Sequence, residues 1–241
     1  MNADTFKEIH SKFCEAINKL QIYNNYTVSL ELKKTAIENC IHFIKFIKNE
    51  KYKAIRNQNS TIANQLFHMQ CVLNCILSSL KIWLYIDNNQ FKNGWDSLID
   101  AYEYLFIAKK INEYEGLLNL EKHLNSIENC IFPKRKIYLS AAFTSTIGSC
   151  SICNKDFHEC NHIENNVYCG QLCYRTNISN IKGNHVAFVD NPKDRRCIVT
   201  SYGQENSIID SFTLEEIKLK EKTQEGIFHA HILSFSKLDW N

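Results

Sequence analysis

The chain has 241 residues, of which 44% are hydrophobic and 22% are charged, a composition typical of folded globular proteins and not of disordered chains. Its 28 Lys and Arg nearly balance its 26 Asp and Glu. The net charge of +2 excludes a protein whose whole surface is basic for binding nucleic acid or acidic membranes. The length allows one large domain or two modest ones.

Residues 1–132 are expected to form a helical bundle. They contain no proline and only two glycines, Gly94 and Gly116, so residues that break helices are scarce. Apolar residues recur at helical spacing in five successive segments. The expected helices lie around residues 6–20, 30–47, 62–86, 91–111 and 113–129. The third segment is apolar on nearly all sides, which predicts a central, buried helix.

The pattern changes at Pro133, after which short apolar and β-branched runs typical of strands appear. Strands are expected within residues 136–144, 167–174, 185–189, 197–202 and 227–234. The segment Thr213-Leu-Glu-Glu216 matches a capping box and predicts one short helix over residues 213–222. The sequence therefore predicts an α+β protein, with an all-α bundle in residues 1–132 and a small β-rich domain in residues 133–241.

Cysteine usage points to a reducing compartment. The chain has 11 cysteines, and its first ten residues lack the apolar core of a secretion signal. In the cytoplasm, clustered Cys and His bind metal more often than they form disulfides. The most apolar stretch, residues 71–86, contains Asn74 and Lys81 and falls short of the roughly 18 uninterrupted apolar residues that a membrane span needs. We therefore expect a cytoplasmic protein with no membrane span and no membrane partner.

Residues 150–162 contain the most specific functional motif, a Cys-x2-Cys pair followed by Cys-x-His. Cys150 and Cys153 are expected to form a tight turn that brings two thiolates together, and Cys160 and His162 can complete a tetrahedron around the same ion. Thiolate and imidazole ligands favour zinc over magnesium or calcium. We expect one structural Zn²⁺ per chain, because four protein ligands leave no coordination position for a substrate. Zinc would then hold the β-rich domain together.

Three further residues compete for places in this site. His158 lies two residues before Cys160 and can replace His162, while Cys169 and Cys173 lie in a run typical of a strand. If only three ligands bind, the open fourth position makes a zinc-dependent hydrolase an alternative function. The histidines expected near such an open metal site are His158, His185, His229 and His231.

The ligand spacing resembles that of a small zinc module in bacterial and phage-related proteins of mostly unknown function. The resemblance covers about residues 150–199 and includes Tyr168, Gly170 and a strand that ends in a Val-Asp-x-Pro-like turn. It implies the ligand set of three cysteines and one histidine, and a bacterial setting such as a phage-related or anti-phage system. It implies no reaction. Cys169 and Cys173 are additional to the module's pattern.

Basic residues around the zinc motif suggest nucleic-acid binding as a second alternative function. Residues 133–204 hold nine Lys and Arg against five Asp and Glu. The candidate nucleic-acid contacts are Lys134, Arg135, Lys136, Arg175, Arg195 and Arg196. Such charges are more often a solvated face, so this alternative stays second to a protein-binding role.

The sequence thus favours a non-enzymatic zinc-binding interaction or adaptor protein. Its expected partner is another protein, or a second copy of the chain, bound through the helical bundle. No G-x-x-x-x-G-K-[ST] phosphate loop and no G-x-G-x-x-G motif occurs, so no nucleotide is expected.

Overall fold

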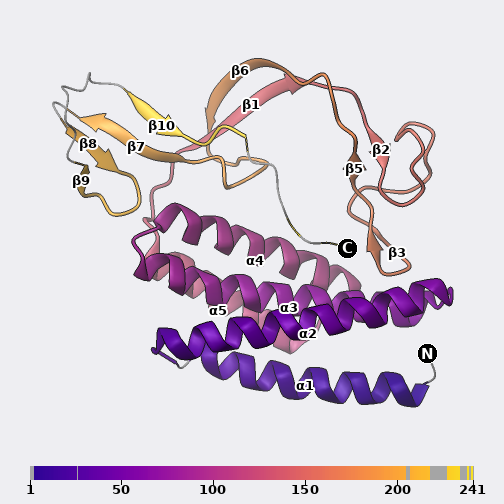
Figure 1. The fold of residues 1–241 in the computed structure, drawn as a ribbon. Coiled ribbons are helices and arrows are strands. Elements are labelled where there is room, and N and C mark those ends of the chain that lie inside the picture. Colours follow the sequence, from indigo (N-terminus) through magenta and orange to yellow (C-terminus); the bar gives the residue numbers. More distant parts are fainter. Residues whose placement is uncertain are drawn as a thin grey trace.

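The computed structural model describes residues 3–25, 27–204, 207–217, 227–233, 238 and 240. Five long helices pack side by side, and the strands form a second layer that arches over them (Figure 1). The helices are α1 (Ala3–Asn25), α2 (Leu30–Arg56), α3 (Ser60–Asp87), α4 (Phe91–Ile111) and α5 (Glu115–Ile131). The predicted α+β class and the predicted bundle of five helices are confirmed.

α3 is the central helix of the bundle, as its apolar sequence predicts. It contacts α1, α2 and α4, and Phe67 and Leu73 on it are fully buried. The Asn59 side chain accepts a hydrogen bond from the backbone N–H of Ile62 at 3.1 Å, which fixes the start of the helix. Among the described helices, α3 alone is long and apolar enough to cross a membrane, and most of its apolar stretch is buried by protein.

The strands of the described residues form four antiparallel sheets. β1 (Tyr138–Thr144) pairs with β6 (Lys182–Val189) in a two-stranded ribbon. The largest sheet has the order β10-β7-β8-β9, with bounds β7 (Val199–Gln204), β8 (Ser207–Asp210), β9 (Glu216–Ile217) and β10 (Phe228–Ala230). The remaining strands are β2 (Ser149–Cys150), β3 (Val167–Tyr168), β4 (Gln171–Leu172) and β5 (Arg175–Thr176). Each of the five runs predicted to contain a strand does so.

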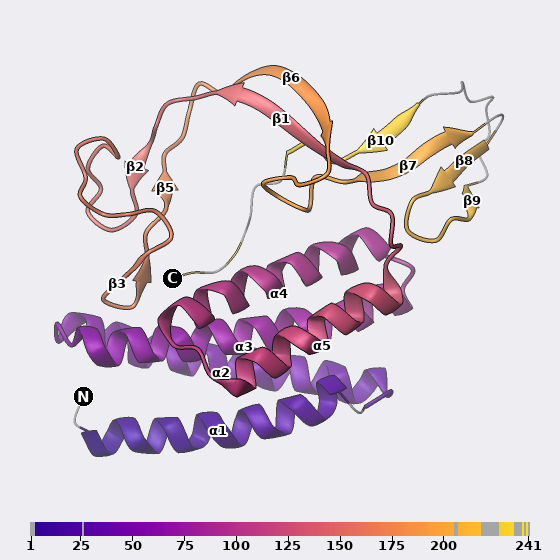
Figure 2. The same ribbon diagram turned by 180° about the vertical axis from the view of Figure 1, so that it is seen from behind.

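The ribbon of β1 and β6 runs along the bundle and connects two separate groups of strands. The four-stranded sheet lies over one end of the bundle, and the hairpins of β2, β3, β4 and β5 lie over the other end (Figures 1 and 2). The strand layer is therefore an arch whose two ends approach the helices.

The prediction of a helix over residues 213–222 is wrong for residues 213–217, the part of the range that the structure describes. Leu214 has a positive φ of 60°, and Glu216–Ile217 form β9, which pairs with β8. The Thr213 hydroxyl accepts a hydrogen bond from the backbone N–H of Glu215 at 3.3 Å. The motif therefore closes a turn, because a short polar side chain can satisfy backbone groups in either structure. Residues 218–222, and residue 234 of the last predicted strand, lie outside the described residues.

Trp95 on α4 joins the bundle to the strand layer. Its side chain is fully buried, and its Nε1 donates a hydrogen bond to the backbone oxygen of Arg195 at 2.8 Å. The Trp95 ring meets Phe132, which follows α5, edge to face at a centroid distance of 5.1 Å. Phe132 in turn contacts Phe212 beside β8 at 6.2 Å. The apolar core of the bundle thus continues into the strand layer.

Arg196 makes the second connection at this end of the bundle. The residue is 4% exposed, and its guanidinium reaches three carboxylates. Its NH2 and NH1 nitrogens donate to Asp100 Oδ1 at 2.5 Å and to Glu103 Oε1 at 2.8 Å, both on α4. NH1 also donates to Asp194 Oδ1 at 3.0 Å. This cluster fixes the segment before β7 against the acidic face of α4.

A buried histidine makes the stability of the bundle depend on pH. His68 on α3 is 8% exposed. Burial lowers its pKa from 6.5 to about 4, against an opposing hydrogen bond to the Asn112 backbone. Because the folded-state pKa lies below the unfolded-state value, stability declines as the pH falls from about 6.5 to about 4. Across this pH window, the free energy of unfolding measured in urea is expected to fall by up to about 3 kcal/mol more in the wild type than in His68→Phe. A difference between the two proteins that is constant with pH would contradict this expectation.

Candidate metal centre

The Cys-x2-Cys turn begins where β2 ends. The backbone N–H of Asn154 donates to the carbonyl of Cys150 at 2.9 Å, and Asn154 closes the turn with a φ of 57°. The backbone N–H of Ile152 points at the Cys150 sulfur at 3.4 Å. These bonds close the turn that contains both cysteines and give the Cys150 sulfur a backbone hydrogen-bond donor.

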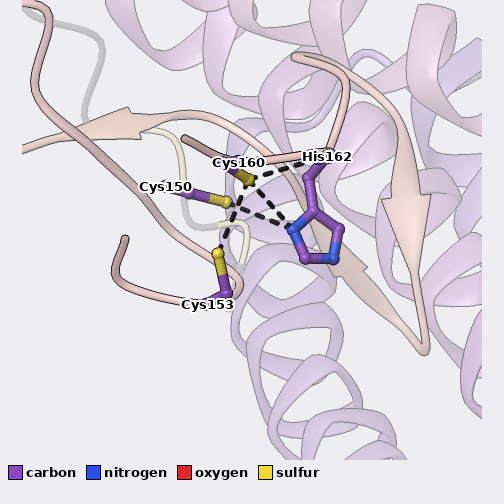
Figure 3. A group of neighbouring side chains, drawn as sticks. All are labelled: Cys150, Cys153, Cys160 and His162. Atoms are coloured by element: carbon purple, nitrogen blue, oxygen red, sulfur yellow. Dashed lines mark hydrogen bonds between the residues drawn. The ribbon is translucent and has the colours of Figure 1, made fainter. Parts of the chain in front are cut away.

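The four residues predicted as zinc ligands come together. One ligand atom from each of Cys150, Cys153, Cys160 and His162 lies within 4.8 Å of all the others. Figure 3 shows the three sulfur atoms and the His162 ring facing a common centre. Cys150 is buried and the other three are half-buried, so the group lies in a partly enclosed site. This group can hold a metal ion.

The distances exclude a disulfide, and two of them match the edges of a tetrahedral metal site. The sulfur atoms of Cys153 and Cys160 are 3.5 Å apart, far beyond the bond length of about 2.05 Å in a disulfide. His162 Nδ1 lies 3.2 Å from the Cys160 sulfur and 3.7 Å from the Cys150 sulfur. With zinc–sulfur bonds of about 2.3 Å and zinc–nitrogen bonds of about 2.0 Å, tetrahedral edges measure about 3.5–3.8 Å.

The thiols of this group differ in their ease of ionisation. Burial raises the pKa of Cys150, but hydrogen bonds from the backbone of Cys153 and Ile152 outweigh it and lower the pKa to about 6. The pKa of Cys160 is raised to about 11 by desolvation and by its sulfur neighbours. Several thiolates at this spacing repel one another, so a bound cation is the natural partner for the fully deprotonated set.

Tyr168 and Glu164 hold the loop that carries His162. The Tyr168 ring packs edge to face on the His162 ring at 4.5 Å, and its hydroxyl accepts a hydrogen bond from the backbone N–H of Ile163 at 2.9 Å. Glu164 accepts two hydrogen bonds from Arg175, at 3.1 and 2.8 Å. Sequence reasoning missed Glu164, because one carboxylate near a ligand carries no signal of its distant partner.

The three alternative ligands occupy different places. Cys173 is buried, and its sulfur lies 3.8 Å from the Cys150 sulfur, although it is not part of the mutually close group of four. Desolvation and the Cys150 side chain raise the pKa of Cys173 to about 12. Cys169 and His158 also lie outside the group. Cys173 is therefore the one alternative that the structure brings next to a predicted ligand.

None of the histidines predicted for an open hydrolytic site belongs to the described group of four. His229 Nδ1 lies 2.9 Å from the Ser201 hydroxyl, and His185 is exposed on β6. The described group that can hold a metal ion consists of the three cysteines and His162.

Most of the predicted nucleic-acid contacts are ion-paired with carboxylates. Arg195 and Lys136 both pair with Glu128 on α5. Arg175 and Arg196 make the ion pairs described above. Of the six candidate contacts, Lys134 and Arg135 remain exposed. Four of the six candidate charges are therefore offset by neighbouring carboxylates.

The hairpins around the candidate metal group contact the bundle at the start of α3 and the end of α4. The backbone N–H of Gly170 donates to Asn64 Oδ1 at 2.7 Å. Lys110 at the end of α4 donates to the carbonyl of Asn165 at 2.9 Å and to Asn166 Oδ1 at 2.6 Å. This end of the arch therefore rests on two helices through polar contacts.

Gly170 permits this contact and gives a test of it. The residue has a φ of 73°, and a Cβ at this position would lie 2.8 Å from the backbone oxygen of Ala63. We expect Gly170→Ala to lower the free energy of unfolding by about 1–3 kcal/mol, because both the left-handed backbone and the close helix disfavour a side chain. Gly183→Ala is the matched control, since a Cβ at Gly183 meets nothing within 4 Å. Equal stabilities of the two variants in chemical denaturation would refute the contact.

No protein-family model matches the chain, and no match to it was found among curated proteins or among solved structures.

Proposed function

We propose that the chain is a non-enzymatic zinc-binding interaction protein whose metal site is structural. The observation that carries the proposal is the mutual distance of four protein ligand atoms, all within 4.8 Å. A zinc ion with three thiolates and one imidazole is fully coordinated, so its role is to hold the chain together and not to activate water. The resemblance of residues 150–199 supports a setting in a bacterial, phage-related or anti-phage system.

The small size of the strands around the site supports a structural role for zinc. Each of β2, β3, β4 and β5 has two residues. Hairpins this short bury too little apolar surface to be stable alone. A structural zinc site contributes on the order of 10 kcal/mol to folding, which is ample for a segment of this size.

Exposed apolar side chains on the strand layer support a role in protein binding. Phe188 on β6 is 60% exposed, and Val186 on the same strand is 47% exposed. Phe228 on β10 lies against Phe188 at a centroid distance of 5.6 Å and is itself 47% exposed. Apolar groups that gather on a surface are typical of binding sites for another protein. The partner surface would then include the strand layer in addition to the predicted helical bundle.

Metal analysis of two cysteine variants tests the proposal. Native mass spectrometry of protein purified without added zinc is expected to show one zinc per chain in the wild type. Cys153→Ser is expected to lose the metal, because serine replaces one of four ligands. Cys130→Ser is the matched control, since Cys130 is exposed on α5 and lies outside the ligand group. Zinc retained at full occupancy in Cys153→Ser would contradict the four-ligand assignment.

A further inference from the structure

A cleft of about 1110 Å³ lies on the bundle between α1, α3 and the segment that joins α4 to α5. Its apolar walls include Phe6 and Phe13 from α1, Met69 from α3, and Tyr114 from the joining segment. None of the proposed zinc ligands lines the cleft. Its volume matches that of clefts that hold small organic molecules in proteins. The cleft is therefore large enough for a ligand that the zinc site does not involve.

One buried polar atom in the wall of this cleft has no partner. His68 lines the cleft and is 8% exposed, and its Nε2 atom makes no hydrogen bond within the described structure. The His68 ring lies 5.7 Å from the Tyr114 ring, which lines the same cleft. Buried polar atoms in proteins nearly always have a hydrogen-bond partner. A ligand whose hydroxyl reaches this nitrogen from the cleft would supply the missing partner.

The protonation state of His68 defines which partner it needs. The imidazole makes a hydrogen bond with the Asn112 backbone that favours its protonated form, so the ring nitrogen donates to the carbonyl oxygen. Because Nε2 has no partner, the donating atom is Nδ1. Burial lowers the pKa of His68 to about 4, so the ring is neutral at pH 7. Neutral Nε2 then carries a lone pair and accepts a hydrogen bond.

The remaining lining residues restrict the charge and shape of the ligand. Lys7 is the one Lys, Arg, Asp or Glu that lines the described cleft, so no carboxylate there would balance a cationic ligand. Phe6, Phe13 and Tyr114 present aromatic rings, and Met69 presents a thioether. These side chains pack well against a flat aromatic ligand. Ser11, Gln65 and Asn112 add further polar groups to the lining. The cleft thus combines aromatic walls with a buried histidine nitrogen that has no partner in the described structure.

We propose that this cleft binds a small aromatic compound with a phenol-type hydroxyl, which donates a hydrogen bond to Nε2 of His68. The ring of the ligand packs among Phe6, Phe13 and Tyr114. A neutral or anionic ligand is accepted, because Lys7 is at the cleft. This binding site adds to the proposed interaction function and is independent of zinc.

Calorimetric titration with two probes of similar shape tests the hydrogen bond. The probes are 2-naphthol, which carries the donor, and 2-methoxynaphthalene, which lacks it. The wild type is expected to bind 2-naphthol about tenfold more tightly, the effect of one net hydrogen bond. In His68→Phe the preference is expected to vanish while binding of the methoxy probe remains. Equal affinities of the two probes for the wild type, or a preference that survives in His68→Phe, would overturn the proposal.

A second pair of variants tests the location. Gln65 on α3 lines the cleft and is exposed, so Gln65→Trp is expected to fill the cleft and abolish binding of both probes. Asn39→Trp adds the same side chain to an exposed position on α2 that does not line the cleft, and it is expected to leave both affinities unchanged. Binding of 2-naphthol that persists in Gln65→Trp, or no binding by the wild type, contradicts the assigned site.

Discussion

Removal of zinc by a chelator is expected to unfold residues 149–176 while the helical bundle stays folded. The metal-binding segment contains only two-residue strands, and loss of the zinc removes a contribution on the order of 10 kcal/mol from it. The bundle has its own core, in which residues such as Leu66, Trp95 and Leu105 are at most 2% exposed. Native-state hydrogen exchange should therefore show fast exchange in residues 149–176 and retained protection in α3 and α4.

The control for this experiment is the return of zinc after chelation, which is expected to restore protection of residues 149–176. Cys130→Ser should behave as the wild type throughout, because its sulfur lies outside the ligand group. Protection of the metal-binding segment that survives complete removal of the metal would show that zinc is not structural. Simultaneous unfolding of the bundle would show that the two parts do not have separate stabilities.

Replacement of Arg196 is expected to produce the second-largest loss of stability. In Arg196→Met the carboxylates of Asp100, Glu103 and Asp194 remain close together without their shared cation. Removing one partner from a buried ion cluster typically costs about 3–5 kcal/mol. The side chains of the three carboxylates are 25–39% exposed, so water screens part of the effect. We expect Arg196→Met to lower the free energy of unfolding, measured in urea, by about 3 kcal/mol.

Two further variants isolate the contribution of the charge cluster. Arg135→Met makes the same substitution at an exposed arginine, and it is expected to change stability by less than about 0.5 kcal/mol. Adding Glu103→Gln to Arg196→Met should recover part of the loss, because it removes one of the unpaired charges. If Arg196→Met is as stable as Arg135→Met, the cluster does not hold the strand layer to α4.

The bundle and the metal group were predictable because both are encoded locally. Helical spacing of apolar residues identifies each helix from its own segment, as in the nearly uniform apolar character of α3. The four residues of the candidate metal group lie within thirteen positions, from Cys150 to His162. A tight turn brings Cys150 and Cys153 together, and the other two residues of the group follow Cys153 within nine positions. The spacing of these residues in the sequence is therefore enough to predict a metal site.

Contacts between distant segments were not predictable from the sequence. Arg196 was a candidate nucleic-acid contact, but it pairs with Asp100, which lies 96 positions earlier in the chain. No periodic pattern relates two such residues. At Thr213 even the local structure was not predictable, because the residues there suit both a helix cap and a hairpin turn. Pairing with β8 decides between the two.

The positions of the residues that connect the two layers also imply an order of events during synthesis. Trp95 and Asp100 lie on α4, whereas their partners Arg195 and Arg196 emerge from the ribosome about a hundred residues later. Helix-to-helix contacts in the bundle close short loops and form early, but these contacts between the arch and α4 can form only after Arg195 and Arg196 have been synthesised. We therefore expect the nascent bundle to expose the Trp95 ring and an unneutralised acidic face on α4. Until Arg195 and Arg196 have left the ribosome, this surface is open to chaperones.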